Sequence, residues 1–317
     1  MSCRAAVAQR LGVDTASVLV TQGSQQALSL LAQALVDPGA VVIVDDPVYV
    51  GALQVFQAVG AQVRAIPIGP AGTGTGPLQR LLDGGVRPTI VHTVSNFHNP
   101  RGVTATLETR LQLAQLADRY GFWIIEDDPY GELRFRGEPV TSIAALSDRV
   151  IRLGSASKIL APALRVGWLS AQPQVLAAVE RLRQAADLCG STLSQLIVAE
   201  LLSDSPWLAT HLDTQRAEYG ARATALHAAL QADLGDRAQF IEPDGGMFCW
   251  VRIPGVDATA LLPTAVEHGV GYVPESAFAV DADLHDCLRL SFATLRPDRL
   301  AEAVSRLCAA IASAKSR

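Results

Sequence analysis

Two kinds of segment alternate along this chain. Short apolar runs rich in valine and isoleucine are each followed by a longer amphipathic run, and the apolar runs cover residues 18–21, 41–46, 89–94, 122–128 and 150–157. Apolar runs with so little polar alternation are typical of strands buried on both faces, as in a parallel sheet covered by helices. The pattern therefore predicts an α/β fold with a mainly parallel central sheet between helices.

After residue 170 the pattern changes. Helical periodicity covers residues 173–188, 191–203 and 206–233, and the remainder predicts strands within 239–253, a helix over 258–269, strands over 270–273 and 287–293, and a helix from 297. We expect a large domain over residues 1–203 and a smaller C-terminal α+β domain over 204–317. The glycine-rich stretch 69–78 does not join a strand to a helix as a phosphate loop must, so we expect a flexible surface loop.

Composition excludes several classes of function. The chain has 317 residues, 49% of them hydrophobic, and a net charge of −5, which argues against nucleic-acid binding by this chain. Its five cysteines have neither metal-site nor disulfide spacing, so no metal is expected. The N-terminus has no apolar signal core and no apolar run reaches membrane length. We expect a cytoplasmic protein that does not bind membranes.

Polar residues follow five of the predicted strands. The carboxyl ends of parallel strands meet at one edge of a sheet, where α/β proteins bind ligands, so these residues are expected to lie together. Packing explains any one of these groups but hardly all five. In chain order they are Gly23, Ser24 and Gln25; Tyr49; Asn99; Asp127 and Tyr130; and Ser155, Ser157 and Lys158.

The residues at the helix start and those around Lys158 favour the binding of an anion. Residues 23–25 open a helix, where free backbone N–H groups suit a phosphate. Ser155, Ser157 and Arg165 can add hydroxyl donors and a planar cation to the same anion. Ser24 taken alone is equally explained as a helix N-cap.

The remaining residues of the set favour the binding of an aromatic ring. Asp127 leaves a buried strand, and a carboxylate there needs a partner such as a protonated ring nitrogen, with a structural salt bridge as the alternative. Which of the three acids in Glu126–Asp128 is exposed stays open. Tyr130 and Asn99 can bind a ring oxygen, and Tyr49 offers a flat face for stacking.

Lys158 lies in the apolar stretch GSASKILAPALRVGW at residues 154–168, either as a surface residue or as a functional amine. A lysine of lowered pKa forms a Schiff base with an aldehyde. An aldehyde that also carries a phosphate, a ring nitrogen and a phenolic oxygen is pyridoxal 5'-phosphate, whose sites pair such a lysine with a carboxylate at the ring nitrogen. The set therefore predicts this cofactor.

These motifs identify a family resemblance. TQGSQQAL, DDPVY, NFHNPRG, EDDPYGELRF, GSASKILAPALRVGW, PDGGMFCW and LRLSFA follow one another through the chain. In this order they resemble the fold-type I, class I/II pyridoxal-phosphate aminotransferases. Within that family the chain is most similar to the branch of 2-aminoadipate aminotransferases and the effector domains of MocR-type regulators.

The resemblance implies a role for each cofactor residue. Lys158 would hold an internal aldimine and shuttle a proton, while Asp127 would keep the pyridine nitrogen protonated. Tyr130 and Asn99 would bind the phenolic oxygen, and Tyr49 would stack on the ring. The phosphate would be held at the helix start and by the serines and arginine near the lysine, which are Gly23, Ser24, Gln25, Ser155, Ser157 and Arg165.

The resemblance also implies the reaction. Arg289, within LRLSFA, would bind the substrate α-carboxylate as a bidentate fork next to Asn99, although a surface ion pair is the alternative. An amino group would pass from an amino acid to a 2-oxo acid by a ping-pong mechanism. The family's sites lie at a dimer interface, so a homodimer is expected.

The sequence departs from the family pattern in three places. The family's N-terminal arm, with a tyrosine that reaches the neighbouring subunit's cofactor phosphate, has no counterpart before residue 18, which suggests a fragment, a misplaced start or a shortened protein. Arg101 stands where members often have threonine. Glu275 stands where they often have glycine, and we expect its charge near the substrate entrance.

Other functions therefore stay open. The chain could be the effector part of a MocR-type regulator, with a DNA-binding domain before Met1, or an inactive truncated homologue. A lyase or decarboxylase on the same fold is a further alternative, because the reaction depends on which Cα bond lies perpendicular to the cofactor ring.

Overall fold

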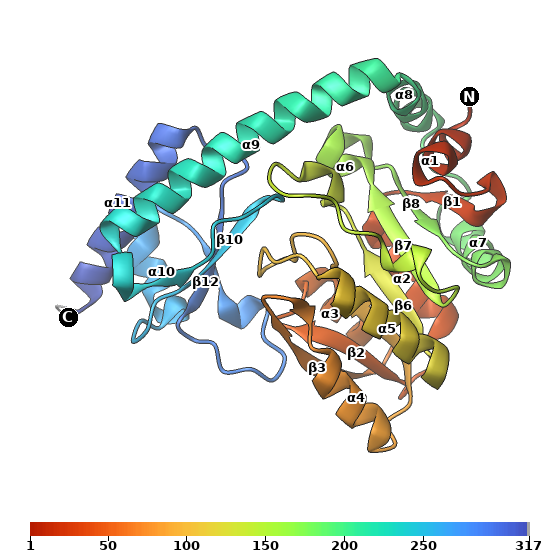
Figure 1. The fold of residues 1–317 in the computed structure, drawn as a ribbon, viewed down its shortest axis with the longest axis horizontal. Helices are drawn as coiled ribbons and strands as arrows, with labels where there is room; N and C mark the ends of the chain where they lie inside the picture. Colours follow the sequence, from red (N-terminus) through yellow and green to blue (C-terminus); the bar gives the residue numbers. More distant parts are fainter. Residues whose placement is uncertain (316–317) are drawn as a thin grey trace.

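The computed structural model describes residues 1–315 and contains two β-sheets with helices packed against them (Figure 1). In this described part the larger sheet has eight strands in the order β1-β8-β7-β6-β5-β2-β3-β4. The block from β7 to β3 is parallel, whereas β8, β1 and β4 run antiparallel to their neighbours. The predicted α/β class with a mainly parallel sheet is confirmed. The strands are β1 (Val18–Thr21), β2 (Val41–Asp46), β3 (Gln62–Gly69), β4 (Gly72–Thr73), β5 (Pro88–Thr93), β6 (Trp123–Asp127), β7 (Val150–Ser155) and β8 (Gly167–Ser170).

Helices cover both faces of this sheet. Val42 and Ile43 of β2 point to opposite faces and neither is exposed, which is why the strand is apolar throughout. Burial of each such side chain contributes about 1.5–3 kcal/mol. One face carries α2 (Ser24–Leu35), α3 (Val50–Ala58) and α7 (Pro173–Asp187), and the other carries α1 (Cys3–Leu11), α4 (Thr75–Asp83), α5 (Leu107–Tyr120) and α8 (Thr192–Ser203).

The smaller sheet is antiparallel, in the order β11-β12-β10-β9, and packs against α10, α11 and the second half of α9. The first half of α9 packs instead with α1 and α8 through Leu208 and Leu212, so this long helix connects the two sheets (Figure 1). The division of the chain at residue 203 stays a prediction. The elements are β9 (Gln239–Phe240), β10 (Phe248–Arg252), β11 (Val273–Pro274), β12 (Cys287–Ser291), α9 (Ser205–Asp233), α10 (Ala258–Glu267) and α11 (Pro297–Lys315).

The glycine-rich stretch 69–78 is not the flexible loop that the sequence suggested. Its residues form β4, which pairs with the end of β3, and the start of α4. Thr73 is buried, and its hydroxyl lies 2.8 Å from that of Thr93. A Cβ on Gly72 would lie 2.7 Å from the Cβ of Ala105, so this glycine permits close packing.

Several other boundaries differ from the prediction. Strands β3 and β8 were not predicted, and the strand expected at 270–273 is instead the two-residue β11. The short pairings of β9 and β11 carry too few alternating positions for a pattern to reveal their limits.

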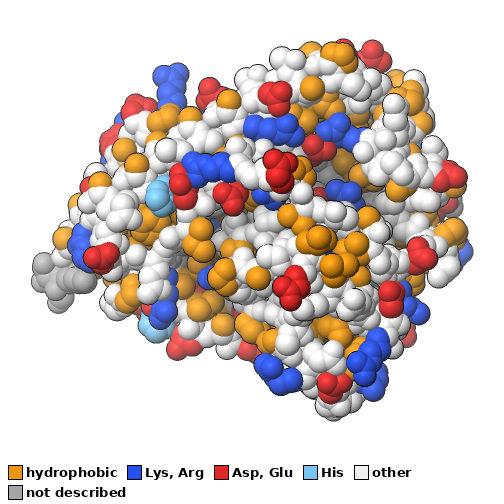
Figure 2. All heavy atoms as spheres, viewed as in Figure 1, with side chains coloured by type: hydrophobic (Ala, Val, Ile, Leu, Met, Phe, Trp, Pro, Cys, Tyr) orange, Lys and Arg blue, Asp and Glu red, His pale blue; other side chains and the backbone are white. Residues whose placement is uncertain are grey.

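The order of the strands brings five carboxyl ends to one edge. β2, β5, β6 and β7 are parallel, and β1 has the same direction because β8 is antiparallel to both β7 and β1. Acidic and basic side chains are interspersed over the face of the molecule in Figure 2. Within residues 1–315, no helix is long and apolar enough to cross a membrane.

Candidate active site

A cavity of about 240 Å³ lies at this edge of the sheet. Val94, Pro129, Pro162 and Phe248 complete its lining. Eleven residues singled out in the sequence line it together: Gly23, Ser24, Gln25, Tyr49, Asn99, Asp127, Tyr130, Ser155, Ser157, Lys158 and Arg165.

Donors converge at one end of the cavity. α2 begins at Ser24, and its N-cap residue Gly23, with φ of 84°, has no side chain that could cap the first N–H groups. Arg165 lies against this helix start and donates from Nη1 to the Ser157 hydroxyl at 3.4 Å. The Ser155 hydroxyl accepts from the Ser157 backbone N–H at 3.1 Å, which closes the turn that carries Lys158. This end suits an anion such as phosphate.

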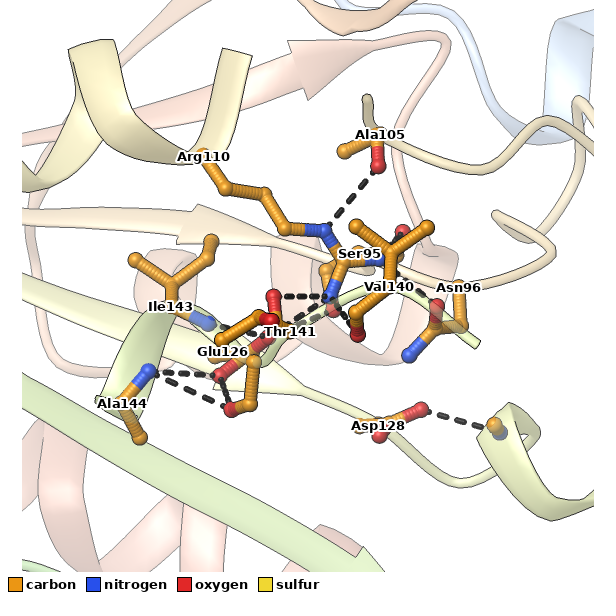
Figure 3. A network of polar contacts seen from close by, with 12 residues as sticks. Ser95, Asn96, Ala105, Arg110, Glu126, Asp128, Val140, Thr141, Ile143 and Ala144 are labelled. Atoms are coloured by element: carbon orange, nitrogen blue, oxygen red, sulfur yellow. Dashed lines mark hydrogen bonds and ion pairs between the residues drawn. The ribbon is translucent and has the colours of Figure 1, made fainter. Parts of the chain in front are cut away.

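Glu126 and Asp128, the two acids on either side of Asp127 in the chain, have different partners (Figure 3). Glu126 is fully buried and accepts from the Ser95 hydroxyl at 2.8 Å and from the backbone N–H groups of residues 143 and 144 at 3.1 Å. Arg110 lies 3.6 Å from it, and Asp128 pairs with Arg152 at 2.9 Å. Both flanking acids therefore belong to structural ion pairs.

Asp127 is different. It is 4% exposed, its Oδ1 has no hydrogen-bond partner, and its Oδ2 lies 3.8 Å from Nε2 of His92. A buried carboxylate oxygen without a donor is costly, so Asp127 has the character of a group that awaits a proton donor from a ligand.

Lys158 lines the same cavity as Asp127 and lies near two arginines. Burial, followed by the positive charges of Arg165 and Arg289, lowers the pKa of the Lys158 amine. A larger fraction of the amine is therefore neutral at a given pH than in an exposed lysine. A neutral amine is the form that attacks an aldehyde.

Two tyrosines line the cavity between these groups. Burial, then the charge of Asp127, raises the pKa of both Tyr49 and Tyr130, so both phenols stay protonated and can donate. Asn99 lines the cavity beside Tyr130 and acts against the rise of its pKa. The Tyr49 hydroxyl donates to Oε1 of Gln25 at 3.1 Å, which fixes its ring at the cavity wall.

Arg289 adjoins the cavity from β12 of the smaller sheet. Its Nη1 donates to Oδ1 of Asn99 at 2.6 Å, and its guanidinium carbon lies 4.0 Å from the ring centre of Phe248 and 4.9 Å from that of Phe278. Its Nε has no partner. The surface ion pair considered from the sequence is not formed, because Arg289 has no carboxylate within ion-pair distance among the described residues.

Sequence reasoning missed Phe248, Phe278 and His92. A phenylalanine that faces a site has the same sequence signature as one in a core, and only the PDGGMFCW motif drew attention to Phe248. Glu275 is not exposed at an entrance as expected: it is 6% exposed and outside the cavity lining, and burial raises its pKa.

Together these groups suit a phosphate-bearing ring that reacts with a lysine amine. Residues 2–307 match the family model described as aminotransferase class I and II, and the chain therefore belongs to this family. It is a pyridoxal-phosphate-dependent transaminase.

Individual relatives agree with this membership. Aromatic-amino-acid aminotransferase 1 of Thermococcus litoralis is 37% identical over 306 residues, which cover 94% of this chain and 73% of that protein. The solved α-aminoadipate aminotransferase of Thermus thermophilus, complexed with N-(5'-phosphopyridoxyl)-L-leucine, has a TM-score of 0.93 and 35% identity, and the match covers 98% of this chain and 81% of that one. The probable rhizopine catabolism regulatory protein MocR of Rhizobium meliloti is 30% identical over 99% of this chain and 64% of its own length.

The residues present fit pyridoxal phosphate. The uncapped start of α2 and Arg165 match its phosphate, and the unpartnered Oδ1 of Asp127 matches its protonated ring nitrogen. A Cβ on Gly23 would lie 2.7 Å from Nη2 of Arg165, so the space between them depends on glycine.

Gly23→Ala should therefore weaken cofactor binding. The added methyl group displaces the Arg165 guanidinium, and we expect the affinity for pyridoxal phosphate to fall about tenfold or more in an absorbance titration. Gly12→Ala is the matched control, because Gly12 also has positive φ at a helix end but no atom lies within 4 Å of its added Cβ. Equal cofactor affinities in the two variants would contradict a phosphate site formed by the start of α2 and Arg165.

Proposed function

We propose that Lys158 carries the cofactor of this transaminase and moves the substrate proton. The sequence contains two lysines, Lys158 in the cavity and Lys315 near the C-terminus. When bound, pyridoxal phosphate supplies an aldehyde carbon for the amino group and a ring that accepts electrons from the substrate Cα. The lowered pKa of Lys158 provides a neutral amine that can take up the Cα proton and return it.

Asp127 is proposed to keep a proton on the cofactor ring nitrogen. The unpartnered Oδ1, buried at the end of β6, supports this role. The cost of leaving that oxygen without a donor is offset when a charged N–H points at it. His92 is a buried neighbour of this carboxylate, with its Nε2 3.8 Å from Oδ2.

The remaining cavity residues are proposed to orient the cofactor. Tyr130 and Asn99 hold the phenolic oxygen, since the raised pKa of Tyr130 keeps its hydroxyl a donor. Tyr49 stacks on the ring from its fixed place beside Gln25. The phosphate is held by the start of α2 and by Ser155, Ser157 and Arg165.

Arg289 is proposed to bind the substrate α-carboxylate, and its free Nε and its position beside Asn99 support this. An amino acid and a 2-oxo acid carry the same α-carboxylate. One arginine at the edge of one cofactor therefore serves both halves of a ping-pong reaction, with the amino acid leaving as its 2-oxo acid before the second substrate binds.

The similarity to MocR supports a second candidate, in which the same cavity senses a ligand for a regulator. A sensor needs Lys158 and the residues that bind the cofactor phosphate, but it does not need rapid proton transfer. Cofactor binding with turnover therefore separates the enzyme from the sensor.

Lys158→Ala should abolish covalent cofactor attachment and lower transaminase turnover by about 100-fold or more, because the attacking and proton-moving amine is removed. Borohydride treatment after addition of pyridoxal phosphate, followed by peptide mass mapping, should place the label on Lys158. Lys315→Arg, which removes the other lysine, should retain the label and the turnover. A label on Lys315, or full turnover in Lys158→Ala, would exclude the proposal. Labelling without any turnover would favour the sensor.

The pH dependence of labelling should follow the cations around Lys158. Because burial and then these positive charges lower the pKa of Lys158, the labelling rate with pyridoxal should rise through a midpoint below that of an exposed lysine. Arg289→Gln removes one of these charges, so the pKa and the midpoint should move to higher pH. Arg252→Gln, on the adjacent strand and half-exposed, should leave the midpoint unchanged. A midpoint that stays in place or falls in Arg289→Gln would contradict this electrostatic account.

We also propose a homodimer that forms through the end of α7 and the outer face of α8. Leu188, Leu193, Leu196 and Ile197 are exposed there by 84%, 70%, 59% and 40%. Apolar residues gathered in this way on a surface mark protein interfaces. The adjoining Asp187 accepts from Gln22 at 2.8 Å, next to Gly23, so a second copy at this face would lie near the phosphate end of the cavity.

Sedimentation equilibrium should give about twice the chain mass of 33.5 kDa for the cofactor-loaded protein. Leu196→Glu should shift the protein to monomer, because a charge would be buried in the interface. Leu107→Glu, at a 48% exposed position on α5, should leave the mass unchanged. A wild-type monomer at micromolar concentration would rule out this interface.

A further inference from the structure

Asp46, the last residue of β2, binds a backbone segment that connects β11 to β12 of the smaller sheet. Its carboxylate accepts from the backbone N–H groups of Val280 at 3.1 Å, Asp281 at 2.9 Å and Ala282 at 2.8 Å. Asp46 is 7% exposed and has no cationic partner within ion-pair distance in the described residues. Its negative charge is therefore balanced by three converging amides, which is a strong arrangement for a buried anion.

The held segment, residues 278–282, lies where the two sheets meet. Val280 packs against the core of the larger sheet, whereas Phe278 belongs to a small cluster with Trp250 and Cys287. A further bond runs from the Val48 N–H to the Phe278 carbonyl at 2.8 Å. Asp46 at the end of β2 and Val48 in the turn after it thus bind the two ends of this segment.

Phe278 carries this constraint to Arg289. Its ring centre lies 4.9 Å from the Arg289 guanidinium carbon and 6.0 Å from the ring of Trp250. Arg289 has an aromatic wall and one amide contact, with Asn99, but no carboxylate partner to set its position. Its guanidinium therefore contacts the segment that Asp46 binds, through Phe278, as well as Phe248 and Asn99.

We propose that Asp46 is a positioning residue for substrate binding, which acts through residues 278–282 and Phe278 on Arg289. The same turn carries Tyr49, which lines the cofactor cavity. Asp46 therefore sets the distance between the substrate-carboxylate end and the cofactor face of the site. This inference rests on the proposed role of Arg289.

Asp46→Asn is the direct test, carried out on the cofactor-loaded protein. Asparagine keeps one acceptor oxygen but turns an NH2 group towards backbone N–H groups that the Asp46 carboxylate binds, so the segment should loosen and amide hydrogen exchange over residues 278–284 should accelerate. We expect KM for both the amino acid and the 2-oxo acid to rise about tenfold or more, with a change in kcat several-fold smaller. Labelling at Lys158 should persist, since Asp46 does not line the cavity.

Asp281→Asn is the matched control, because it removes the same charge from an exposed position in the same segment and keeps the backbone N–H. Its KM values should stay within about twofold of the wild type. Phe278→Leu supplies a second variant: it should raise KM as Asp46→Asn does while the amides of residues 280–282 remain protected.

A double-mutant cycle separates positioning from general damage. Arg289→Lys should raise KM by itself, and Asp46→Asn should add little in that background because both act on one contact. Additive losses, or an unchanged KM in Asp46→Asn with accelerated exchange, would overturn the inference about Asp46. An unchanged KM in Arg289→Lys would instead overturn the proposed role of Arg289.

Discussion

The buried, half-unpartnered carboxylate of Asp127 is the constraint on which the site depends. The Asp127 carboxylate is 4% exposed and its Oδ1 has no donor, which costs free energy. Packing in the rest of the fold offsets this cost. The neighbouring Glu126 is bound to Arg110 and to two backbone amides, which anchors the end of β6. The strand end is therefore rigid while its site-facing carboxylate stays available, which is the preorganisation that a charged cofactor ring requires.

The sheet topology assembles the rest of the site around this carboxylate. The antiparallel β8 returns the chain so that β1 lies beside it with the direction of β7, and a Cβ on Gly167 of β8 would lie 2.4 Å from the Ser24 nitrogen. The anion end of the cavity is thus packed directly against β8, and Arg165, just before β8, donates to Ser157 in the turn that carries Lys158. The smaller sheet adds Arg289 beside Asn99, and the role proposed for it would separate the substrate-carboxylate site from the cofactor site.

Much of this arrangement is predictable from the sequence. The apolar runs of the parallel strands indicate their positions, and polar residues at their ends have one place to meet, so eleven of the cavity-lining residues between Gly23 and Arg165 can be named without a structure. The sequence does not show which of the acids in Glu126–Asp128 is left without an ion-pair partner, because the partners of the other two, Arg110 and Arg152, come from distant elements. The close packing at Gly72 and the contact of Phe248 with Arg289 likewise depend on tertiary neighbours that no local pattern encodes.

The most direct test of the account is an absorbance spectrum of the purified chain with added pyridoxal phosphate, recorded before and after an amino acid is supplied. The account predicts a visible band of enzyme-bound cofactor that converts to the pyridoxamine form when the amino acid is added, and returns when a 2-oxo acid follows. A cofactor that remains free in solution, or a bound band that no amino acid changes, would contradict the claim that this cavity carries out amino-group transfer.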